Sequence, residues 1–364
     1  MKLSHMKILH VITSLQTGGA ETLVVNLMPR FRTFGHEVGV VVFNGQRTAL
    51  MERLERECPE CKIYKLGESY YNPLYILKLW RVMRRYDIVH THNSSPQLFV
   101  AIANILCRKK LVTTEHSTNN RKREQGGVLR LIDKLMYKHY HKVICISEIA
   151  EKTLTGYLGG ATSNICTINN GVDVGAFHNA TPAENLKNGR FSVVMVAGFR
   201  EAKDQDTLIR AIGRLPKEDY ELWLVGDGVR RSELESLVND LKLEGQVRFY
   251  GLRTDVANIL KAADVVVMSS HWEGLSLSNI EGMSVGKPFI ASDVKGLHEI
   301  TEGSGLLFPH GDDKALADLI AQLHDDKELY KQVAEACYEK ARQFDISKMV
   351  EKYNELYKEV DDKT

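Results

Sequence analysis

Residues 272–288, WEGLSLSNIEGMSVGKP, decide the fold and mark the candidate site of this 364-residue chain. They follow a nearly continuous apolar run at residues 263–270 (ADVVVMSS), which is typical of a strand buried on both faces of a parallel sheet. A helix is expected to begin near Ser278 and to end at the GKP of residues 286–288, because the residue before proline is disfavoured in a helix. The stretch therefore predicts a buried strand, a glycine-containing turn and a helix in succession.

Two glutamates, Glu273 and Glu281, lie on either side of the expected helix start. The backbone of residues 274–277 leaves several N–H groups free at that helix N-terminus, a place that binds phosphate or a polyhydroxylated ring. A carboxylate there can accept hydrogen bonds from sugar hydroxyls. Ser278 and Glu281 also match a capping box, in which Ser278 caps the helix and Glu281 reaches back to its backbone N–H. These residues alone leave both interpretations open.

Length and composition predict a globular protein of two domains. A chain of 364 residues is too long for one ordinary core, and 43% apolar with 26% charged residues is typical of folded proteins. The formal net charge of +1 conceals an asymmetry. Residues 1–180 hold 24 Lys and Arg against 14 Asp and Glu, a net of +10, whereas residues 181–364 hold 24 against 33, a net of −9. The first half is therefore better suited to an anionic partner.

Membrane spanning, secretion and a disulfide scaffold are not expected. No stretch approaches the roughly eighteen uninterrupted apolar residues of a membrane span. Residues 1–5 lack the apolar core of a signal peptide, and six cysteines in this length do not make a disulfide framework. The expected location is the cytoplasm, and nucleic acid is not an expected partner.

Strand-like and helix-like segments alternate along the chain, which predicts βαβ units and parallel sheets. We expect a first domain at residues 1–175, a polar linker at residues 176–189 and a second domain at residues 190–345. The C-terminal helix, about residues 346–364, is expected to pack back onto the first domain. Two doubly wound α/β domains in tandem would place the carboxyl ends of both sheets around one cleft, where ligands of such sheets bind.

Two loops of the first half are candidates for ligand contact. Gly18 and Gly19 let the backbone approach a ligand at a helix N-terminus, although glycine pairs are also common in turns without a function. His116 ends a strand in TTEHST, where it could hold a sugar hydroxyl or be an ordinary surface histidine. His90 and His92 share one side of a strand, which permits metal binding, but no third ligand lies at a useful spacing. We therefore expect these two histidines to mark a strand end.

The loop after the first strand of the second half carries two cations, Arg200 and Lys203. Beside the loop of Glu273 they describe a diphosphate site, since cations and helix-N-terminal amides neutralise phosphate charge. They would also stabilise negative charge on a departing diphosphate without a metal. Asp204 and Asp206 match a D-x-D metal motif, but they stand at the start of a helix, where Asp is favoured. We therefore expect no metal and no other cofactor.

A basic, partly amphipathic segment at residues 120–142 supplies much of the first half's positive charge. The apolar residues on one side of it are Leu129, Ile132, Leu135 and Met136. Such a segment can lie on an anionic bilayer, which would place the protein at the inner face of the plasma membrane. A solvated helix face is the alternative, and the sequence leaves both open.

Several motifs together resemble the retaining glycosyltransferases of family 4, which have the GT-B fold, over essentially the whole chain. They are GGAE (18–21), the strand-end EHST, NNGVD (169–173), the R-x-x-K loop, VGDG (225–228), RFYG (248–251) and EGLSLSNIE. Each is weak alone, but their order and spacing are specific. The resemblance implies two Rossmann-like domains facing a central cleft. It also implies a nucleotide-sugar donor held mainly by the second domain and a glycan or lipid-linked acceptor held by the first.

The resemblance further implies roles for individual residues. Lys203 would bind the donor diphosphate, with help from backbone amides near Gly19, and Glu281 would hold the ribose hydroxyls. His116 would contact the donor sugar near the reacting centre, and the base would meet the backbone around Leu252 and Arg253. The transferred sugar would be held by Glu273 and by the backbone of Gly274, Leu275, Ser276 and Leu277. The family transfers sugar with retention, a uridine donor is its commonest case, and cell-surface polysaccharide synthesis is a typical setting.

One position departs from the family pattern. An arginine is common two residues before the position of Arg200, where this chain has Gly198, and we expect Arg200 to supply the missing cation. Two rival functions share the fold. A nucleotide-sugar 2-epimerase would need further acid and base carboxylates around the sugar. A catalytically silent binding subunit is suggested by Gly198 alone, and the presence of the other site residues argues against it.

Overall fold

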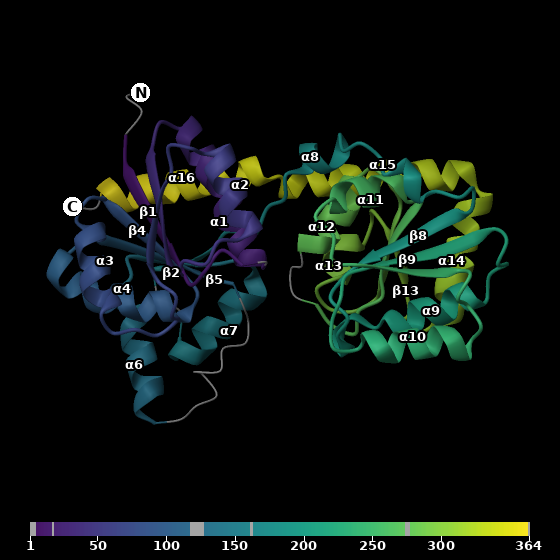
Figure 1. Ribbon diagram of the computed structural model, residues 1–364, viewed down its shortest axis with the longest axis horizontal. Helices are drawn as coiled ribbons and strands as arrows, with labels where there is room; N and C mark the ends of the chain where they lie inside the picture. The colour runs from purple at the N-terminus through teal and green to yellow at the C-terminus, as the bar shows by residue number, and fades with distance from the viewer. Residues whose placement is uncertain (1–4, 17, 117–126, 161–162, 274–276, 363–364) are drawn as a thin grey trace. The chain divides into compact units, whose positions relative to one another are not determined.

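The computed structural model describes residues 5–16, 18–116, 127–160, 163–273 and 277–362. The chain forms two compact units, Met1–Asn169 with Ser347–Thr364, and Asn170–Ile346 (Figure 1). Each unit is built on one sheet of parallel strands with helices on both faces. The predicted fold class, two doubly wound α/β domains, is confirmed.

The sheet of the first unit has the strand order β3-β2-β1-β4-β5-β6-β7. The order changes direction between β1 and β4, and this is the switch point at which ligands of such sheets bind. Its strands are β1 (Lys7–Ile12), β2 (Glu37–Asn44), β3 (Lys62–Gly67), β4 (Ile88–His92), β5 (Lys110–Glu115), β6 (Lys142–Cys145) and β7 (Ile165–Thr167). Its helices are α1 (Gly19–Thr33), α2 (Ala49–Glu57), α3 (Tyr75–Met83), α4 (Ser94–Cys107), α6 (Val128–Tyr137), α7 (Glu148–Leu158) and α16 (Ile346–Asp362).

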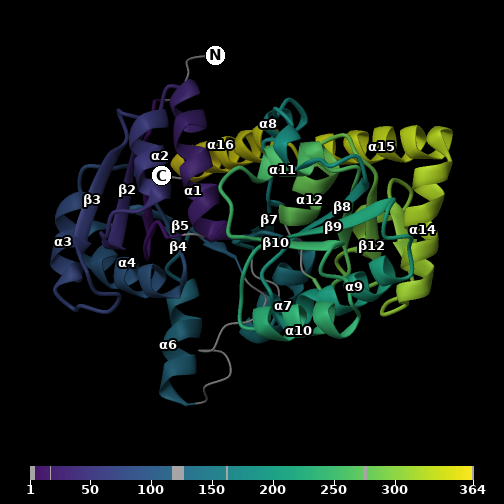
Figure 2. The same cartoon turned by 45° about the vertical axis from the view of Figure 1, so that its right-hand side comes forward.

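The C-terminal helix α16 packs against the sheet of the first unit. Tyr353 and Tyr357 on α16 are buried and contact Phe31 of α1. Ion pairs fix the far end of the helix, with Lys110 Nζ 2.9 Å from Asp361 Oδ1 and Lys142 Nζ 3.0 Å from Glu359 Oε1. The buried tyrosines of α16 therefore complete the core of the first unit, and Figure 2 shows this helix beside α1.

The sheet of the second unit has the order β10-β9-β8-β11-β12-β13, with its own switch point between β8 and β11. Its strands are β8 (Phe191–Val196), β9 (Tyr220–Val225), β10 (Val247–Gly251), β11 (Val265–Met268), β12 (Phe289–Ser292) and β13 (Leu306–Phe308). Its α-helices are α8 (Val174–His178), α9 (Gln205–Gly213), α10 (Arg231–Asp240), α11 (Val256–Ala262), α12 (Leu277–Ser284), α13 (His298–Thr301), α14 (Asp313–Asp325) and α15 (Lys327–Ala341). Short 3-10 helices occupy η1 (Glu184–Leu186), η2 (Glu201–Lys203) and η3 (Arg342–Phe344).

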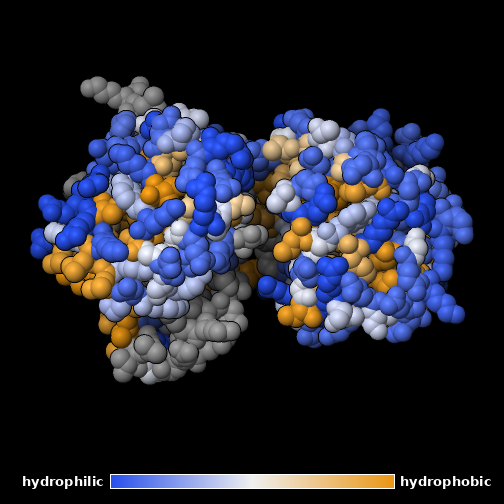
Figure 3. Space-filling view, in the orientation of Figure 1, coloured by the Kyte–Doolittle hydropathy of each residue, from blue (hydrophilic) through white to orange (hydrophobic). Residues whose placement is uncertain are grey.

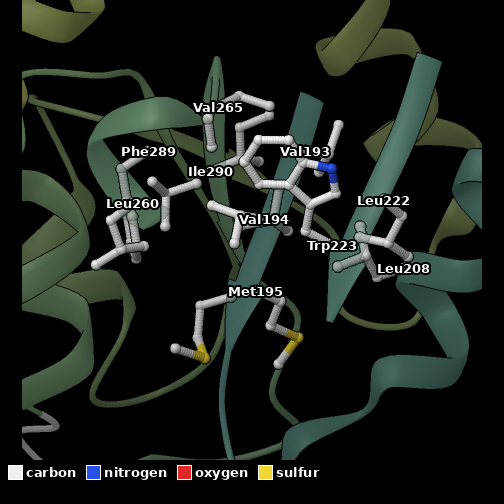
Figure 4. Close-up of a cluster of buried hydrophobic side chains, with 14 of the residues drawn as sticks. Val193, Val194, Met195, Leu208, Leu222, Trp223, Leu260, Val265, Phe289 and Ile290 are labelled. Atoms are coloured by element: carbon white, nitrogen blue, oxygen red, sulfur yellow. The ribbon is translucent and has the colours of Figure 1, made fainter. Parts of the chain in front are cut away.

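Fully buried apolar side chains hold the central strands of this second sheet. Val194 on β8, Trp223 on β9 and Phe289 on β12 belong to one core (Figure 4). Helix α12 packs closely on this core, since a Cβ at Gly282 would come within 2.9 Å of Val266 Cγ1 and 3.0 Å of the Phe289 ring. This packing fixes where β8 and β11 end, and hence where their loops lie.

The division between the units falls after Asn169, ahead of the linker expected at residues 176–189. Val172, Val174 and Leu186 are buried in the core of the second unit. The polar composition around them suggests a free linker, but these apolar side chains tie the segment to the second unit. Of the helices in the described parts of the chain, none is long and apolar enough to cross a membrane.

Candidate functional site

Two loops of the second unit lie side by side at the carboxyl edge of its sheet. They follow β8 and β11, which are paired neighbours with Val193 opposite Val265. Ser269 Oγ donates a hydrogen bond of 2.7 Å to the backbone oxygen of Asp204, and the His271 N–H donates one of 2.9 Å to that of Ala202. The loop of Arg200 and the loop of Glu273, which were expected to lie beside each other, are therefore bonded to each other.

Lys203 and Glu273 form an ion pair across these two loops. The Lys203 ammonium donates to Glu273 Oε1, and Ser270 Oγ donates to the same oxygen at 2.8 Å. The Glu273 side chain is 8% exposed and that of Lys203 is 21% exposed. The carboxylate is therefore held in place with its charge balanced, while the ammonium keeps a face open to a ligand.

Arg200 lies in the same loop with its side chain exposed. A Cβ built on Gly198 would lie 3.8 Å from Arg200 Nε and meets nothing closer. Gly198 is not among the glycines with positive φ, so this position does not require glycine. No ion pair of Arg200 occurs within the described residues. The guanidinium of Arg200 thus lies beside the place where the family commonly carries an arginine side chain.

The D-x-D residues both have structural partners. Asp204 caps α9, accepting from Thr207 N at 3.2 Å and from Thr207 Oγ1 at 2.7 Å. Arg230 donates two hydrogen bonds of 2.7 and 3.0 Å to Asp206. Burial alone would raise the pKa of the Asp206 carboxyl, but the contact with Arg230 lowers it overall. The helix-start interpretation of this motif is confirmed.

A group with metal-ligand chemistry nevertheless lies beside this cap. His271 Nδ1 is 3.6 Å from Asp204 Oδ2 and 2.5 Å from His310 Nε2, so the three residues could together approach a divalent cation. No local spacing indicates this group, because His310 follows β13, far along the chain. The expectation of a metal-independent site stays a prediction, and removal of metal by a chelator tests it.

Glu281 lies on the first turns of α12, partly buried. The helix begins at Leu277, so Ser278 lies inside its first turn and is not placed as the cap that a capping box requires. Burial raises the pKa of Glu281 to about 7. A buried carboxyl of this kind gains from a ligand that donates hydrogen bonds to its ionised form. Gly274, Leu275 and Ser276, whose backbone the sequence analysis assigns to the sugar, lie outside the described residues.

The loop after β10 carries the residues expected to meet a base. Leu252 is 80% exposed, and Arg253 is tied to Asp255 by two hydrogen bonds of 2.8 and 2.7 Å. Gly251 has φ +65°, and its carbonyl accepts from the Gly226 N–H at 2.9 Å. The side chain of Arg253 therefore braces its own loop, which leaves the backbone and the exposed Leu252 to cover a flat ring.

In the first unit, the candidate residues lie at the ends of neighbouring strands. Gly18 caps α1 in an extended conformation, and a Cβ there would meet the Glu21 carboxylate. A Cβ at Gly19 would meet nothing within 4 Å, so that part of the backbone is open to a ligand. His116 directly follows β5, which pairs with β4, which in turn pairs with β1. The turn of Gly18 and Gly19 and the strand end of His116 thus share one edge of the sheet.

One histidine that the sequence analysis missed completes a cluster with His90 and His92. His10 on β1 brings the donor atoms of the three residues within 4.8 Å of one another, all of them buried. The statement that no third ligand exists is therefore wrong. The pattern missed it because β1 and β4, far apart in sequence, are adjacent strands.

The basic segment is described from residue 127 onward, and its residues 120–126 lie outside the described chain. On α6, Ile132 is 41% and Leu135 is 46% exposed. Met136 lines one groove together with Ile132 and Leu135, as expected for residues on one side of the helix, and it is buried in the core of the first unit. The apolar side of α6 therefore lies partly in the core and partly at the surface.

Comparison with known families covers nearly the whole chain. The model of the Glycosyltransferase Family 4 matches residues 17–176, and that of the Glycosyl transferases group 1 matches residues 178–340. Among curated proteins, the chain is 26% identical to N-acetyl-alpha-D-glucosaminyl L-malate synthase of Bacillus anthracis, over 95% of this chain and 96% of that protein. It is 28% identical, over 78% of each chain, to UDP-Gal:alpha-D-GlcNAc-diphosphoundecaprenol alpha-1,3-galactosyltransferase of Escherichia coli.

Solved structures share the same fold. HepE of Anabaena, crystallised with UDP, superposes with a TM-score of 0.82 at 23% identity, over 97% of this chain and 100% of that one. A glycosyltransferase of Rickettsia africae gives a TM-score of 0.83 at 20% identity, over 99% and 100% of the two chains. These likenesses extend over both units of the chain.

Proposed function

The chain belongs to the family 4 glycosyltransferases, and we propose that it transfers a sugar, with retention and without metal, from a uridine diphosphate sugar to a glycan or lipid-linked acceptor. The observation that carries the proposal is the cluster at the ends of β8 and β11. There the Lys203 ammonium is held by the buried Glu273 beside the exposed Arg200 and the start of α12. An array of cations and a helix N-terminus suits a diphosphate.

The proposed donor contacts follow from this arrangement. Lys203 and Arg200 bind the diphosphate and stabilise the charge that grows on it as the sugar departs. Glu273, held by Lys203 and Ser270, accepts hydrogen bonds from the transferred sugar together with the backbone of residues 274–277. Glu281 accepts from the ribose hydroxyls. The family resemblance also assigns donor contacts to the backbone near Gly19 and to the imidazole of His116.

The proposed chemistry is front-face substitution. The diphosphate leaves and the acceptor hydroxyl attacks from the same side, passing its proton to the departing phosphate oxygen. Such a step needs charge stabilisation rather than the pair of opposed carboxylates that retaining hydrolases use. The cations of the β8 loop supply that stabilisation, so a bound metal is not required.

The nature of the donor is inferred from the relatives. HepE was crystallised with UDP, and the name of the Escherichia coli relative includes UDP-galactose and a diphosphoundecaprenol acceptor. Similar ligands are therefore proposed for this chain, in the synthesis of a surface polysaccharide.

The proposed function is tested by incubating the purified chain with UDP-, GDP- and ADP-sugars in EDTA and measuring the nucleoside diphosphate that is released. We expect release from one class of donor. The release should be slow when water is the only acceptor and faster when a sugar acceptor is added. Epimerisation of the sugar without release would support the 2-epimerase. Binding without any turnover would support the silent subunit.

Arg200 is expected to take over the role of the arginine that the family commonly has at position 198. The Arg200→Ala variant should bind donor about tenfold more weakly, because one charge-assisted contact is lost. The variant that combines Arg200→Ala with Gly198→Arg should recover most of this affinity, since a Cβ at position 198 meets nothing nearer than 3.8 Å. Donor affinity is measured by calorimetric titration. An unchanged affinity in Arg200→Ala, or no recovery in the double variant, would contradict the proposal that Arg200 replaces the arginine common in the family.

Helices α4 and α6 carry a surface suited to an anionic bilayer, and we propose that it docks there. Apolar side chains from both helices line a common groove. Hydrophobic surface over this region is visible in Figure 3. The exposed apolar residues of the two helices are Ile102, Ile105, Leu106, Leu131, Ile132 and Leu135. Cationic residues lie on or directly after the same two helices, at Arg108, Lys109, Arg130, Lys134 and Lys138. Apolar contact and attraction to anionic lipid act together on such a surface.

The double variant Ile105→Glu with Leu131→Glu should bind vesicles of anionic lipid at least about tenfold more weakly. Two exposed apolar side chains are replaced by carboxylates, which the negatively charged lipid repels. The matched control is Val229→Glu with Leu241→Glu, which changes the net charge equally at exposed positions of the second unit. Co-sedimentation with vesicles measures the affinity. Equal binding by the two double variants would favour the solvated helix face.

A further inference from the structure

A chain of buried polar groups runs from the C-terminal helix to His116. His10 lies on β1 opposite His90 of β4, and His92 lies two residues further along β4. The three imidazoles are fully buried and their rings are packed together, with centroids 4.5 to 5.2 Å apart. Three buried histidines in the middle of a parallel sheet are costly unless each polar atom has a partner.

Hydrogen bonds connect these groups in one sequence. His116 Nε2 lies 2.9 Å from His92 Nδ1, and His92 Nε2 lies 2.9 Å from His10 Nδ1. His10 Nε2 lies 3.4 Å from the hydroxyl of Tyr357 on α16. That hydroxyl lies 2.5 Å from His90 Nδ1, and His90 Nε2 lies 2.8 Å from Thr114 Oγ1. The hydrogen-bonded series therefore runs from Thr114 through His90, Tyr357 of α16, His10 and His92 to His116.

All ring nitrogens of His10, His90 and His92 are engaged in this chain. A metal ion among the three histidines would have to displace several of these bonds, so the hydrogen-bonded arrangement accounts for the cluster better than a metal centre does. Burial lowers the pKa of His10 to about 3 and that of His116 to about 4, and lowers those of His90 and His92 as well. Near neutral pH each ring is therefore uncharged and has one N–H donor and one acceptor.

The distances around Tyr357 set the direction of the bonds. A hydroxyl has one proton, and O–H donors make shorter hydrogen bonds than N–H donors. The 2.5 Å contact is therefore assigned to the Tyr357 O–H donating to His90 Nδ1, and the 3.4 Å contact to the His10 Nε2–H donating to Tyr357. His10 Nδ1 is then an acceptor for the His92 Nε2–H. His92 Nδ1 is in turn an acceptor for the His116 Nε2–H.

We propose that His92, His10 and Tyr357 are positioning residues that hold His116 as the neutral Nε2–H tautomer, with its Nδ1 lone pair presented to accept a hydrogen bond from a sugar hydroxyl. No described residue bonds Nδ1 of His116. The ligand in this statement rests on the proposed function, whereas the tautomer rests on the hydrogen bonds alone. The arrangement also ties the state of His116 to the docking of α16.

The tautomer is measured by NMR on the full chain labelled with 15N-histidine, because the ring nitrogen shifts distinguish a protonated from an unprotonated nitrogen. His116 is assigned with the His116→Gln variant. At pH 7 we expect a protonated Nε2 and an unprotonated Nδ1 at His116. A protonated Nδ1 would overturn the proposal, and so would a stoichiometric metal ion bound to His10, His90 and His92 in the purified protein.

The Tyr357→Phe variant breaks the chain at a residue separated from His116 by His10 and His92, at a position where phenylalanine fits the same space. His116 should then populate both tautomers, and kcat should fall by up to about tenfold, the effect of one weakened hydrogen bond, with little change in KM for the donor. Tyr140→Phe is the control. Its buried hydroxyl donates to the Gln97 carbonyl at 2.7 Å and accepts from Thr91 Oγ1 at 3.1 Å, outside the histidine chain.

Identical His116 spectra and identical kcat in Tyr357→Phe and Tyr140→Phe would overturn the proposal. Failure of the proposed function gives a different pattern, in which the wild-type chain shows the expected tautomer but neither binds nor consumes any sugar nucleotide. A kcat loss in Tyr357→Phe without a change of tautomer would indicate a purely structural role, and would also overturn the positioning role.

Discussion

Replacing Lys203 with alanine is expected to lower kcat for sugar transfer by roughly a hundredfold or more, the size of effect seen when one group that stabilises transition-state charge is removed. The ammonium of Lys203 is held by Glu273 where the two loops are bonded, and the Lys203 side chain is 21% exposed. Its charge is therefore available to a diphosphate that becomes more negative as the sugar departs. The initial rate of nucleoside diphosphate release at saturating donor measures the effect.

The variant has a structural consequence that must be separated from the catalytic one. Without Lys203, the Glu273 carboxylate loses its cation while only 8% exposed, which costs about 1–3 kcal/mol of unfolding free energy. Adding Glu273→Gln should restore stability but not turnover. The control Lys217→Ala removes a lysine of the same unit whose ammonium donates to the Lys242 carbonyl. If a stably folded Lys203→Ala variant had the same kcat as Lys217→Ala, the assignment of Lys203 to the site would be contradicted.

Replacing Glu281 with glutamine is expected to weaken the binding of a nucleotide sugar by about tenfold to a hundredfold, since charge-assisted hydrogen bonds to a carboxylate are lost. The side chain keeps its size, so the packing of α12 on the core is preserved. Titration calorimetry at pH 8, where the wild-type carboxyl is mainly ionised, gives the difference in affinity. Equal affinities would show that Glu281 does not contact the donor.

The same residue predicts how binding depends on pH. Burial raises the pKa of Glu281 from an ordinary 4.5 to about 7. Because the ionised form is the one proposed to accept hydrogen bonds from ribose hydroxyls, wild-type affinity should fall as the pH drops through about 7, by at most about tenfold per pH unit. A nucleotide sugar serves as the ligand, since its diphosphate does not titrate in this range. The Glu281→Gln variant should show a flatter profile.

Without ligand, the contribution of Glu281 to the unfolding free energy should decrease as the pH rises, whereas the affinity for the ligand should increase. The folded chain holds a proton on Glu281 between pH 4.5 and about 7, whereas the unfolded chain does not. The contribution of this group to the unfolding free energy is therefore fully present below pH 4.5 and is lost as the pH rises through about 7. Relative to the wild-type chain, Glu281→Gln should gain stability between pH 5 and pH 8. A constant difference across this range would contradict the raised pKa.

Much of the fold and several site positions could be predicted from the sequence. Apolar runs alternating with helical periodicity predict parallel sheets, and the carboxyl end of each strand locates a loop that faces a ligand. Lys203 and Glu273 could be placed in such loops because each lies in the segment between a strand and the next α-helix. The ion pair between them could not be predicted, since it depends on β8 and β11 being adjacent in a sheet whose strand order the sequence does not state.

The remaining differences have the same physical origin. His10 and His310 join their clusters through strands that are distant in sequence, so no local spacing indicates them. Met136 lies on the same side of α6 as the exposed Ile132 and Leu135 but is itself buried, and periodicity alone does not say how deeply each apolar side chain is buried. Leu186 lies in a polar, turn-rich stretch that resembles a linker, yet its side chain fills the core of the second unit. Long-range packing decides each of these cases.

The central claim is that the second unit binds a nucleoside diphosphate through Lys203 and Arg200 without a metal. The most direct measurement is the thermal stability of the chain with UDP, GDP or ADP in the presence of EDTA. We expect one nucleotide, UDP, to stabilise the chain by about 2.7 kcal/mol at a hundred times its dissociation constant, and Lys203→Ala to lose most of this effect. Stabilisation by none of the three, or only after a divalent cation is added, would contradict the claim.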